Sequence, residues 1–328
     1  MKKIITAALI FGLCIGLTAC RESSSVDFTP TENDKKIVMR VGGSEVEYQE
    51  FRYYYLNNKA DIIGEGVAPT EEQTERILAL TEENARNRHG LLLFAKKYGV
   101  AVTKDDKKAA EGYVKQYRNE YFSSDEDYLL ALNSKYMTHD LFKALQSESA
   151  LAYRVLEKMM EAGGIATDDA DIDAAFKSDD IICLKEIFVK YDSAEERTKA
   201  NERAEEALSR LMDGEAFEAL MTEYSDYSAS SMPPEHGYYT MKYDALDVIW
   251  ENAVTLAEGE HSYVIESEYG FHIIMRCEKN YDYMNENRTE IYENYSYAKF
   301  YEKFYPFAET LEIEYTDFGR TLTLDDIQ

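Results

Sequence analysis

The sequence predicts an α+β protein with at least two folded units. Residues 181–278 show a strand pattern, several helix patterns and two closing strand patterns in one stretch. The segment before them is dominated by helix signals, and short strand patterns occur near both ends of the chain, at residues 37–46 and 311–315. A chain of 328 residues can bury more than one sizeable core.

The first 19 residues are typical of a signal peptide. Lys2 and Lys3 precede an apolar run that is too short to span a bilayer comfortably and that ends in small residues. The run closes with LTAC, which resembles the cleavage box of bacterial lipoproteins. This resemblance implies that Cys20 becomes the lipid-modified first residue of the mature chain. The alternative is an ordinary secretory signal with an incidental cysteine.

Residues 20–36 are polar and lack periodicity, so we expect a flexible tether between a membrane anchor and the folded body. The chain carries a formal net charge of −27. Nucleic acid and anionic lipid surfaces would repel it, which argues against both as partners. The charge suits a body held away from an anionic envelope, and a need for solubility alone would also account for it.

The segment that follows predicts a small β element and an array of helices. Residues 37–46 alternate around Gly42 and Gly43, as in a tight hairpin. A capping box at Thr70 and Gln73 opens a long helix. Four more residues precede acidic, helix-forming segments and are expected as N-caps: Thr103, Ser124, Thr138 and Thr167.

Residues 181–278 begin with a strand-like run, IICLKEIFVKY, and continue into two helices. Ser193 and Glu196 have the spacing of a capping box, and Gly214 ends the first helix. The second helix places its apolar residues on one face, and the irregular loop SDYSASSMPPEHG follows it. A short helix, ALDVIWENAVTL, then leads through the turn AEGE to the strands SYVIES and YGFHIIMRCE.

This order of elements resembles the parvulin family of peptidyl-prolyl isomerases. The stretches that carry the resemblance are EIFVK (186–190), FEALMTEYSDYSAS (217–230), HGYYT (236–240), AVTLAEGE (253–260) and EYGFHII (268–274). The last two are the most specific. The resemblance implies a domain over residues 179–280 with a four-stranded antiparallel sheet and helices, and with peptidyl-prolyl cis-trans isomerase activity.

The resemblance also implies where the active site lies. Parvulins use an apolar proline pocket and a polar cluster of two histidines with a cysteine or aspartate. The second histidine matches His272, the first falls at Glu186, and the cysteine or aspartate falls at Tyr227. The usual methionine and phenylalanine of the pocket fall near Ala245 and Ile249. Further candidates for substrate binding are Met241, Tyr238 and Phe271.

These departures from the family pattern predict weak activity. Rotation about an X-Pro bond faces a barrier of about 20 kcal/mol, and an isomerase must favour a twisted amide. A glutamate cannot reproduce a neutral cluster of two histidines, although it can hydrogen-bond the imidazole, and Ile249 lacks a flat ring on which proline packs. The alternatives are that Glu186 is a solvated strand residue and that Tyr227 is structural.

Cys183 and Cys277 are the cysteines of the folded body. The resemblance implies that the first and last strands of the domain lie side by side and antiparallel, with Glu186 and His272 facing a common site. Cys183 then lies opposite Cys277 or one step diagonal to it, and alternation points both cysteines away from that site. This excludes a metal site that combines all four side chains, and it leaves a cross-strand disulfide or two thiols.

Residues 281–317 predict a helix and a strand that return to the helical domain. Phe300, Phe304 and Phe307 keep helical spacing, and Pro306 should kink or end the helix. The strand at residues 311–315 needs a partner for its backbone groups. The nearest candidate is the hairpin at 37–46, so the two ends of the chain would form one domain.

In this organisation residues 37–178 and 281–317 form a helical chaperone domain, residues 179–280 are inserted in it, and a tail of residues 318–328 follows. The whole resembles the envelope foldases of the PrsA and SurA type. This implies a lipid-anchored protein on the extracytoplasmic face of the cell membrane that assists the folding of secreted polypeptides.

Three functions remain open on the sequence: an isomerase and foldase, a non-catalytic holdase with an inactive parvulin fold, and a solute-binding lipoprotein. A solute-binding lipoprotein is disfavoured, because the sequence lacks the alternating βα pattern that two-lobed receptors usually need.

Tyrosine is abundant, with 27 residues, and would serve either helix packing or an amphipathic cradle for unfolded chains. We see no phosphate loop, metal motif or Ser-His-Asp pattern, and we expect no cofactor and no metal. The oligomeric state stays open.

Overall fold

The computed structural model describes residues 32–64, 67–165, 167–191, 193–227, 236–322 and 327. The predicted signal peptide, Cys20 and most of the predicted tether lie outside these residues. The chain divides into two compact units: one comprises Met160–Glu302, and the other combines the residues up to Met159 with those from Lys303 onward.

The unit built from both ends of the chain contains a three-stranded sheet in the order β2-β1-β7. Its strands are β1 (Ile37–Val41), β2 (Ser44–Glu47) and β7 (Ile313–Tyr315). Gly42 and Gly43 form the hairpin turn with φ angles of 53° and 82°, which glycine adopts easily because it has no Cβ atom.

 Both values lie in the left-handed region, as a two-residue hairpin turn requires. Strand β7 pairs antiparallel with β1, with Met39 opposite Tyr315. The predicted pairing of the chain's last strand with the first hairpin is therefore confirmed.

The helices of this unit begin largely where their capping signals lie. They are α2 (Tyr48–Ile63), α3 (Glu71–Lys97), α4 (Lys104–Tyr121), α5 (Asp125–Asn133), α6 (His139–Glu148), α7 (Leu151–Glu161, which ends beyond the unit's boundary) and α14 (Asp317–Thr321). Thr70 and Gln73 form the predicted capping box of α3, and Thr103, Ser124 and Thr138 cap α4, α5 and α6.

Two predictions about helix ends are corrected by the structure. The N-cap of α8 (Asp169–Lys177) is Asp168, whose side chain accepts from the amide of Asp171, and not Thr167. Pro306 was expected to kink or end its helix, and the end is excluded because helix α13 (Arg288–Glu309) continues past it. Both neighbours Thr167 and Asp168 are good capping residues, so the sequence alone does not choose between them.

The unit Met160–Glu302 contains the predicted four-stranded antiparallel sheet, in the order β4-β3-β6-β5. Its strands are β3 (Ile182–Lys190), β4 (Tyr238–Thr240), β5 (Ile265–Ser267) and β6 (Gly270–Cys277). The long central strands β3 and β6 pair along their whole length, from Cys183 opposite Cys277 to Lys190 opposite Gly270. Strand β4 pairs only with residues 182–184 of β3, so the rest of that edge is open to other partners.

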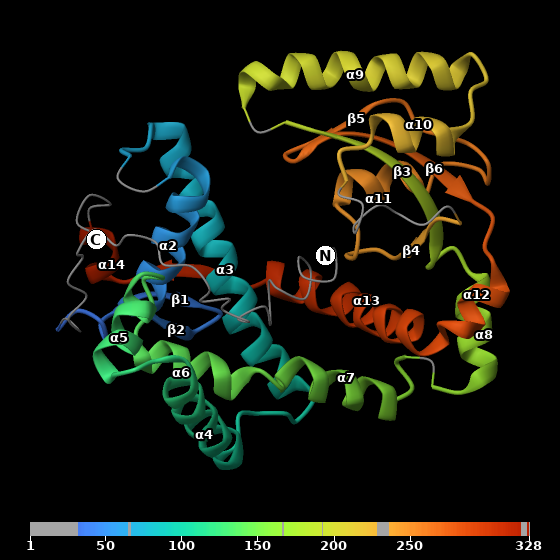
Figure 1. Ribbon diagram of the computed structural model, residues 1–328. Helices are drawn as coiled ribbons and strands as arrows, with labels where there is room; N and C mark the ends of the chain where they lie inside the picture. The colour runs from blue at the N-terminus through green and yellow to red at the C-terminus, as the bar shows by residue number, and fades with distance from the viewer. Residues whose placement is uncertain are drawn as a thin grey trace. The chain divides into compact units, whose positions relative to one another are not determined.

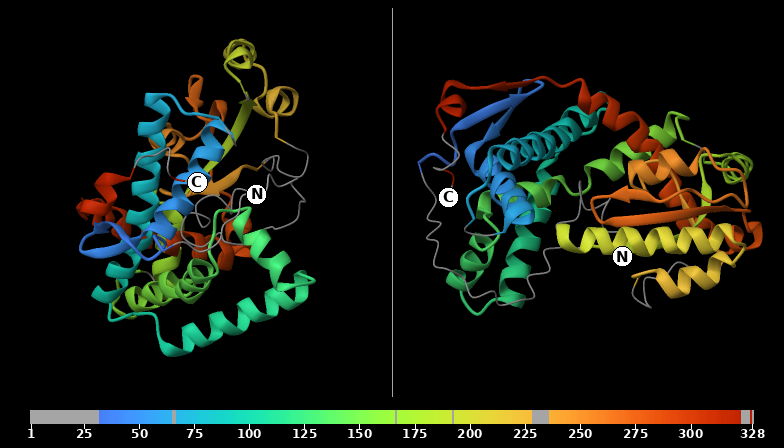
Figure 2. Two further views of the ribbon diagram at one scale, coloured as in Figure 1. Left: turned by 90° about the vertical axis from the view of Figure 1, so that its left-hand side faces the viewer. Right: turned by 90° about the horizontal axis from the view of Figure 1, so that it is seen from above.

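Helices cover both faces of this sheet (Figure 1). Helices α9 (Ala194–Met212) and α10 (Phe217–Tyr224) pack on the face that carries Ile187, Phe271 and Ile273. The short helix α11 (Asp247–Ala253) packs on the opposite face, against Leu184 and Ile274. Figure 2 shows α9, in yellow, running alongside the orange strands. A further cluster of the same unit joins α8, α12 (Tyr281–Glu286) and the first part of α13.

The two cysteines of this unit occupy the register that was predicted. Cys183 lies directly opposite Cys277, on the face that α9 and α10 cover, and both thiols are free in the structure. A hydrogen bond between the two thiols raises the pKa of Cys183 and lowers that of Cys277, and the charge of Lys185 adds to the lowering. The thiolate, which is the reactive form, is therefore favoured at Cys277.

We expect iodoacetamide to modify Cys277 before Cys183 in the native, reduced protein, because Cys183 is also the more buried of the two. Peptide mapping by mass spectrometry measures the two rates. Replacing Cys183 by alanine removes the hydrogen bond and should slow alkylation of Cys277. Equal rates at the two cysteines would contradict this account, and a count of no free thiols in unreduced, denatured protein lacking Cys20 would instead show a cross-strand disulfide.

Candidate active site

The sheet face under α11 carries a buried carboxylate and imidazole that face each other. Glu186 comes from β3 and His272 from β6, and only 2% and 3% of their surfaces are exposed. His272 pairs with Phe188 across the two strands, so Glu186, two residues before Phe188, is the diagonal neighbour of His272 on the same face of the sheet. The Glu186 Oε1 atom lies 2.8 Å from His272 Nδ1. The interpretation of Glu186 as a solvated strand residue is therefore wrong.

The second oxygen of the Glu186 carboxylate accepts two further hydrogen bonds. The hydroxyls of Tyr227 and Tyr238 donate to Oε2 over 2.8 and 3.0 Å. A buried carboxylate costs several kcal/mol unless it is paired and hydrogen-bonded, so these donors are what allow Glu186 to stay in the core. Burial, together with the charge of Glu186, raises the pKa of both tyrosines well above the usual range. Both hydroxyls therefore remain protonated donors.

The other ring nitrogen of His272 contacts Ser267, the last residue of β5. The Ser267 Oγ atom lies 2.7 Å from His272 Nε2 and also accepts from the amide of Tyr269 over 3.1 Å. Because a carboxylate can only accept, the proton on His272 that faces Glu186 is on Nδ1. In the neutral imidazole, Nε2 then accepts from the Ser267 hydroxyl. The sequence analysis did not predict Ser267 as a site residue. Its position just before the turn that leads into GFHII was the feature that could have indicated it.

An aromatic side chain closes the cluster from the same strand as Glu186. The ring of Phe188 stacks on His272 with a centroid distance of 4.8 Å, and it meets the Tyr227 ring at 5.2 Å. Phe188 was not among the predicted site residues. Its even spacing from Glu186 on β3 was the signal that could have found it. The imidazole is thus held on one ring face as well as at both nitrogens.

Tyr227 reaches the cluster because the segment after α10 bonds to the free edge of β3. The amide of Phe188 donates to Ser225 Oγ over 2.9 Å, and the amide of Asp226 donates to the Phe188 carbonyl over 2.7 Å. Asp226 also receives two hydrogen bonds of 3.0 Å from the Arg203 guanidinium on α9. These hydrogen bonds replace the pairing that β4 does not provide along this part of β3. They also fix the position of Tyr227, which follows Asp226.

The predicted pocket residues divide between three places. Ile249 is buried and Ala245 is partly buried on the α11 face, with Tyr238, so these three share the face of the cluster. Phe271 lies on the opposite face, packed with α9 and α10, because neighbouring strand residues point to opposite sides. Met241 packs in the cluster of α8, α12 and α13. The structure does not bring Phe271 or Met241 to His272.

The arrangement suits a reaction in which no covalent bond is made or broken. Each oxygen of Glu186 is occupied by a donor from the protein, so Glu186 orients the other groups. An X-Pro amide has no N–H, so it can only accept hydrogen bonds. The donor that this cluster leaves for it is the Ser267 hydroxyl, whereas His272 Nε2 and the phenol oxygen of Tyr227 can accept from other N–H groups of a substrate, and the aromatic rings give apolar contacts. Such a set can favour one conformation of a bound amide over another through hydrogen bonds and ring contacts.

We expect Glu186→Leu to lower the free energy of unfolding of this unit by about 3 kcal/mol or more, because the imidazole and two phenols lose their acceptor. The chain's single tryptophan, Trp250, lies in α11 over this face, so its fluorescence in a urea titration reports on this unit. The matched control is Glu218→Gln, which removes the partly exposed partner of Lys185 and should cost about 1 kcal/mol or less. Equal transition midpoints for the two variants would contradict the role given to Glu186.

Comparison with known proteins identifies a family for the domain that contains this cluster. The family model of the rotamase PPIC-type PPIase domain matches residues 184–278. The foldase protein PrsA of Bacillus subtilis is 26% identical over 297 residues, which cover 89% of this chain and 83% of that protein. The foldase protein PrsA of Halalkalibacterium halodurans is 29% identical over 162 residues, which cover 49% of this chain and 46% of that protein.

Solved structures of similar proteins include PrsA from Bacillus subtilis and from Streptococcus pneumoniae. The crystal structure of PrsA from Bacillus subtilis aligns with 23% identity over 84% of this chain and 93% of that one, with a TM-score of 0.29. That of PrsA from Streptococcus pneumoniae aligns with 18% identity over 75% and 88%, with a TM-score of 0.35. The assignment of residues 184–278 to a family therefore rests on the sequence matches. Residues 184–278 are thus a parvulin-type peptidyl-prolyl isomerase domain, in a chain that closely resembles the PrsA foldase proteins.

Proposed function

We propose that this protein is an extracytoplasmic foldase, anchored by a lipid on Cys20, that assists secreted polypeptides through slow prolyl isomerisation. The observation that carries the catalytic part is the cluster in which Glu186 holds His272 and Tyr227 on one sheet face. Residues 179–280 act as the isomerase domain, and residues 37–178 with 281–317 act as the chaperone domain. Its partners are unfolded or partly folded polypeptides.

In this proposal the substrate proline packs against apolar side chains beside the cluster. Ala245 and Ile249 provide contacts for the ring, and the rings of Tyr238 and Phe188 border them on the same face of the sheet. The Ser267 hydroxyl donates to the X-Pro carbonyl in place of its bond to His272 Nε2, while Glu186 is a positioning residue. Tyr227 keeps its proton on Glu186, and its phenol oxygen accepts from a peptide N–H of a neighbouring substrate residue.

The same cluster explains why turnover should be slow. His272, Tyr227 and Tyr238 all direct their protons to one carboxylate, so none of them can donate to the carbonyl of a twisted X-Pro amide without losing that internal bond. The proline pocket is also incomplete, because Phe271 and Met241 lie in other clusters. We therefore expect less stabilisation of the twisted amide than a cluster of two histidines provides.

A holdase contribution from the helical unit is the second candidate. Helix α4 carries a row of tyrosines, in which Tyr113 and Tyr121 are 47% and 65% exposed and Tyr117 lies between them. Exposed rings with polar hydroxyls suit weak contacts with many apolar chains. This surface supports chain binding without catalysis.

Attachment to the membrane is proposed from the LTAC sequence alone. Within the parts of the chain that the structure describes, no helix combines the length and apolar character needed to cross a membrane.

We expect mass spectrometry of detergent-extracted protein from a lipoprotein-processing bacterium to find a diacylglyceryl Cys20 as the first residue. Cys20→Ala should abolish the modification and release the protein from the membrane fraction, while Cys14→Ala, within the apolar run, should change neither. A mature chain that starts at another residue and is free in the medium would contradict the proposed anchor.

We expect the form lacking residues 1–20 to catalyse isomerisation of a prolyl tetrapeptide, at a rate below that of a parvulin with two histidines. His272→Ala should reduce kcat/KM about tenfold, as the loss of one or two hydrogen bonds predicts. The matched control is His261→Ala, because this residue lies in the same unit and, within the described part of the chain, its ring hydrogen-bonds only the carbonyl of its neighbour Ser262.

Equal losses in the two variants would show that His272 has no special role. An aggregation assay on the same proteins separates the two candidate functions. If His272→Ala loses isomerisation and still suppresses aggregation, chain binding does not depend on this site. If the unmodified protein shows no isomerisation at all, the holdase proposal replaces the catalytic one.

A further inference from the structure

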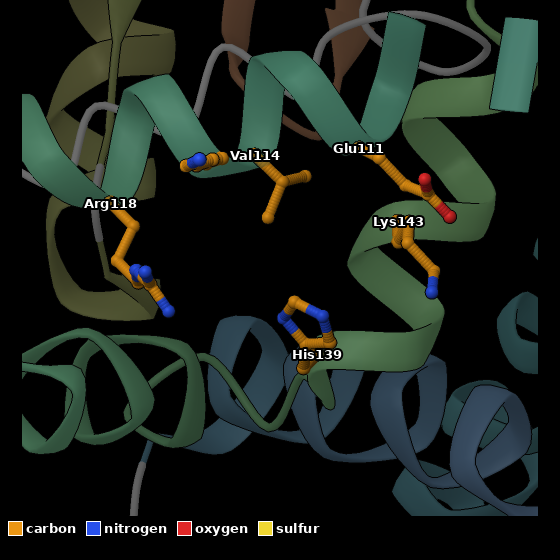
Figure 3. A pocket seen from close by; sticks show the side chains of 6 residues that line it. Glu111, Val114, Arg118, His139 and Lys143 are labelled. Carbon is orange, nitrogen blue, oxygen red and sulfur yellow. The ribbon is translucent and has the colours of Figure 1, made fainter. Parts of the chain in front are cut away.

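A cavity of about 260 Å³ lies between α4 and α6 in the helical unit. Its lining residues are Glu111, Val114, Lys115, Arg118, His139 and Lys143. Figure 3 shows Arg118 and Lys143 on opposite sides of the cavity, with His139 between them on the α6 side and Val114 on the α4 side. Three cationic side chains therefore converge on one small space, in a chain whose net charge is −27.

The cavity lining combines these three cations with one carboxylate, Glu111, which lies on the same side as Lys143 in Figure 3. Among the described residues, no ion pair involves Lys115 or Lys143. Arg118 pairs with Asp125 over 3.2 Å, but the Asp125 side chain is 75% exposed. An exposed pair of this kind contributes about 1 kcal/mol or less, so a ligand can take the place of Asp125 at the guanidinium. The cavity is thus lined by positive charge that an anion can use.

His139 reports the positive potential inside the cavity. Its Nδ1 atom lies 3.0 Å from the hydroxyl of Tyr128 on α5. Burial lowers the pKa of His139, the charges of Lys143 and Arg118 lower it further, and Asp140 opposes them. The imidazole therefore lies where a positive charge is disfavoured, first by burial and then by the neighbouring cations.

We propose that this pocket binds a single carboxylate, carried by an acidic residue or the chain end of a polypeptide. The Arg118 guanidinium can bind a carboxylate with two parallel hydrogen bonds, and Lys143 adds a point charge from the opposite side. Val114 gives an apolar contact for the carbon next to the carboxylate. Glu111 in the lining disfavours a second negative charge on the ligand, which selects a carboxylate over a phosphate dianion.

The surroundings of the pocket suit a peptide better than a free small anion. A second hollow of about 510 Å³ along α4 shares Lys115 and is lined also by Gln116 and Asn119, whose amides can bond a peptide backbone. The chain's overall charge would repel a polyanion much more strongly than a single acidic group in a polypeptide. The identification of this polypeptide as a folding client rests on the proposed function. The carboxylate site itself does not depend on that function.

The test is binding of short labelled peptides to the whole protein lacking residues 1–20, measured by fluorescence anisotropy. Three probes have one sequence with a central Asp, a central Asn or a central phosphoserine, and all have a blocked C-terminus. A fourth has the central Asn and a free C-terminal carboxylate, which distinguishes a chain end from a side chain. The Asp or the free-end probe should bind at least about tenfold more tightly than the blocked Asn probe.

Lys143→Gln should weaken binding of the tighter probe about tenfold. The matched control is Lys108→Gln, because Lys108 is an exposed lysine of α4 that does not line the pocket. A loss in Lys143→Gln without a loss in Lys108→Gln supports the pocket. Equal effects of the two variants would overturn it, and so would equal affinity for carboxylate and amide probes. Tightest binding of the phosphoserine probe would overturn the choice of a carboxylate.

An NMR titration of His139 in the unaltered protein supplies a readout that needs no variant. A bound carboxylate adds negative charge near the imidazole, which Lys143, Arg118, Asp140 and Tyr128 already surround, and should raise the pKa of His139. An unchanged His139 titration in the presence of saturating probe would place the ligand elsewhere. Because isomerase activity is assayed separately, its loss would not count against this pocket, and failure of the pocket would not count against the isomerase.

Discussion

The buried carboxylate of Glu186 is the constraint on which the isomerase domain depends. A charge with 2% exposure is tolerated only when its acceptor sites are filled, and here the donors come from three other parts of the chain. His272 fixes the register of β6 against β3, Tyr238 ties in β4, and Tyr227 requires the segment after α10 to bond along β3. One carboxylate thus links the sheet to the segment that borders the site.

This link has a cost for catalysis. His272 and Tyr227 use their protons to satisfy Glu186, so neither can donate to a substrate carbonyl while the cluster is intact. Phe188 stacked on His272 restricts the imidazole further. The result is an isomerase domain whose polar cluster is held by several hydrogen bonds and a ring contact.

The sequence predicts those parts that depend on local periodicity and register. Alternation along β3 and β6 places Cys183 opposite Cys277 and separates both from Glu186, and capping chemistry places the start of α3 at Thr70. The same alternation could have excluded Phe271, which is next to His272 and faces the other way. The places of Met241, Ser267 and the carboxylate pocket depend on packing between distant segments and on one tight turn, which no local pattern encodes.

The protonation of His272 tests the central claim most directly. We propose to record the imidazole nitrogens of His272 by ¹⁵N NMR in the unaltered protein near neutral pH. The account predicts a proton on Nδ1, protected from exchange by its hydrogen bond to the Glu186 carboxylate. An imidazole that carries its proton only on Nε2 would contradict it, because Glu186 would then have no donor in His272 and could not be the ionised centre of the cluster.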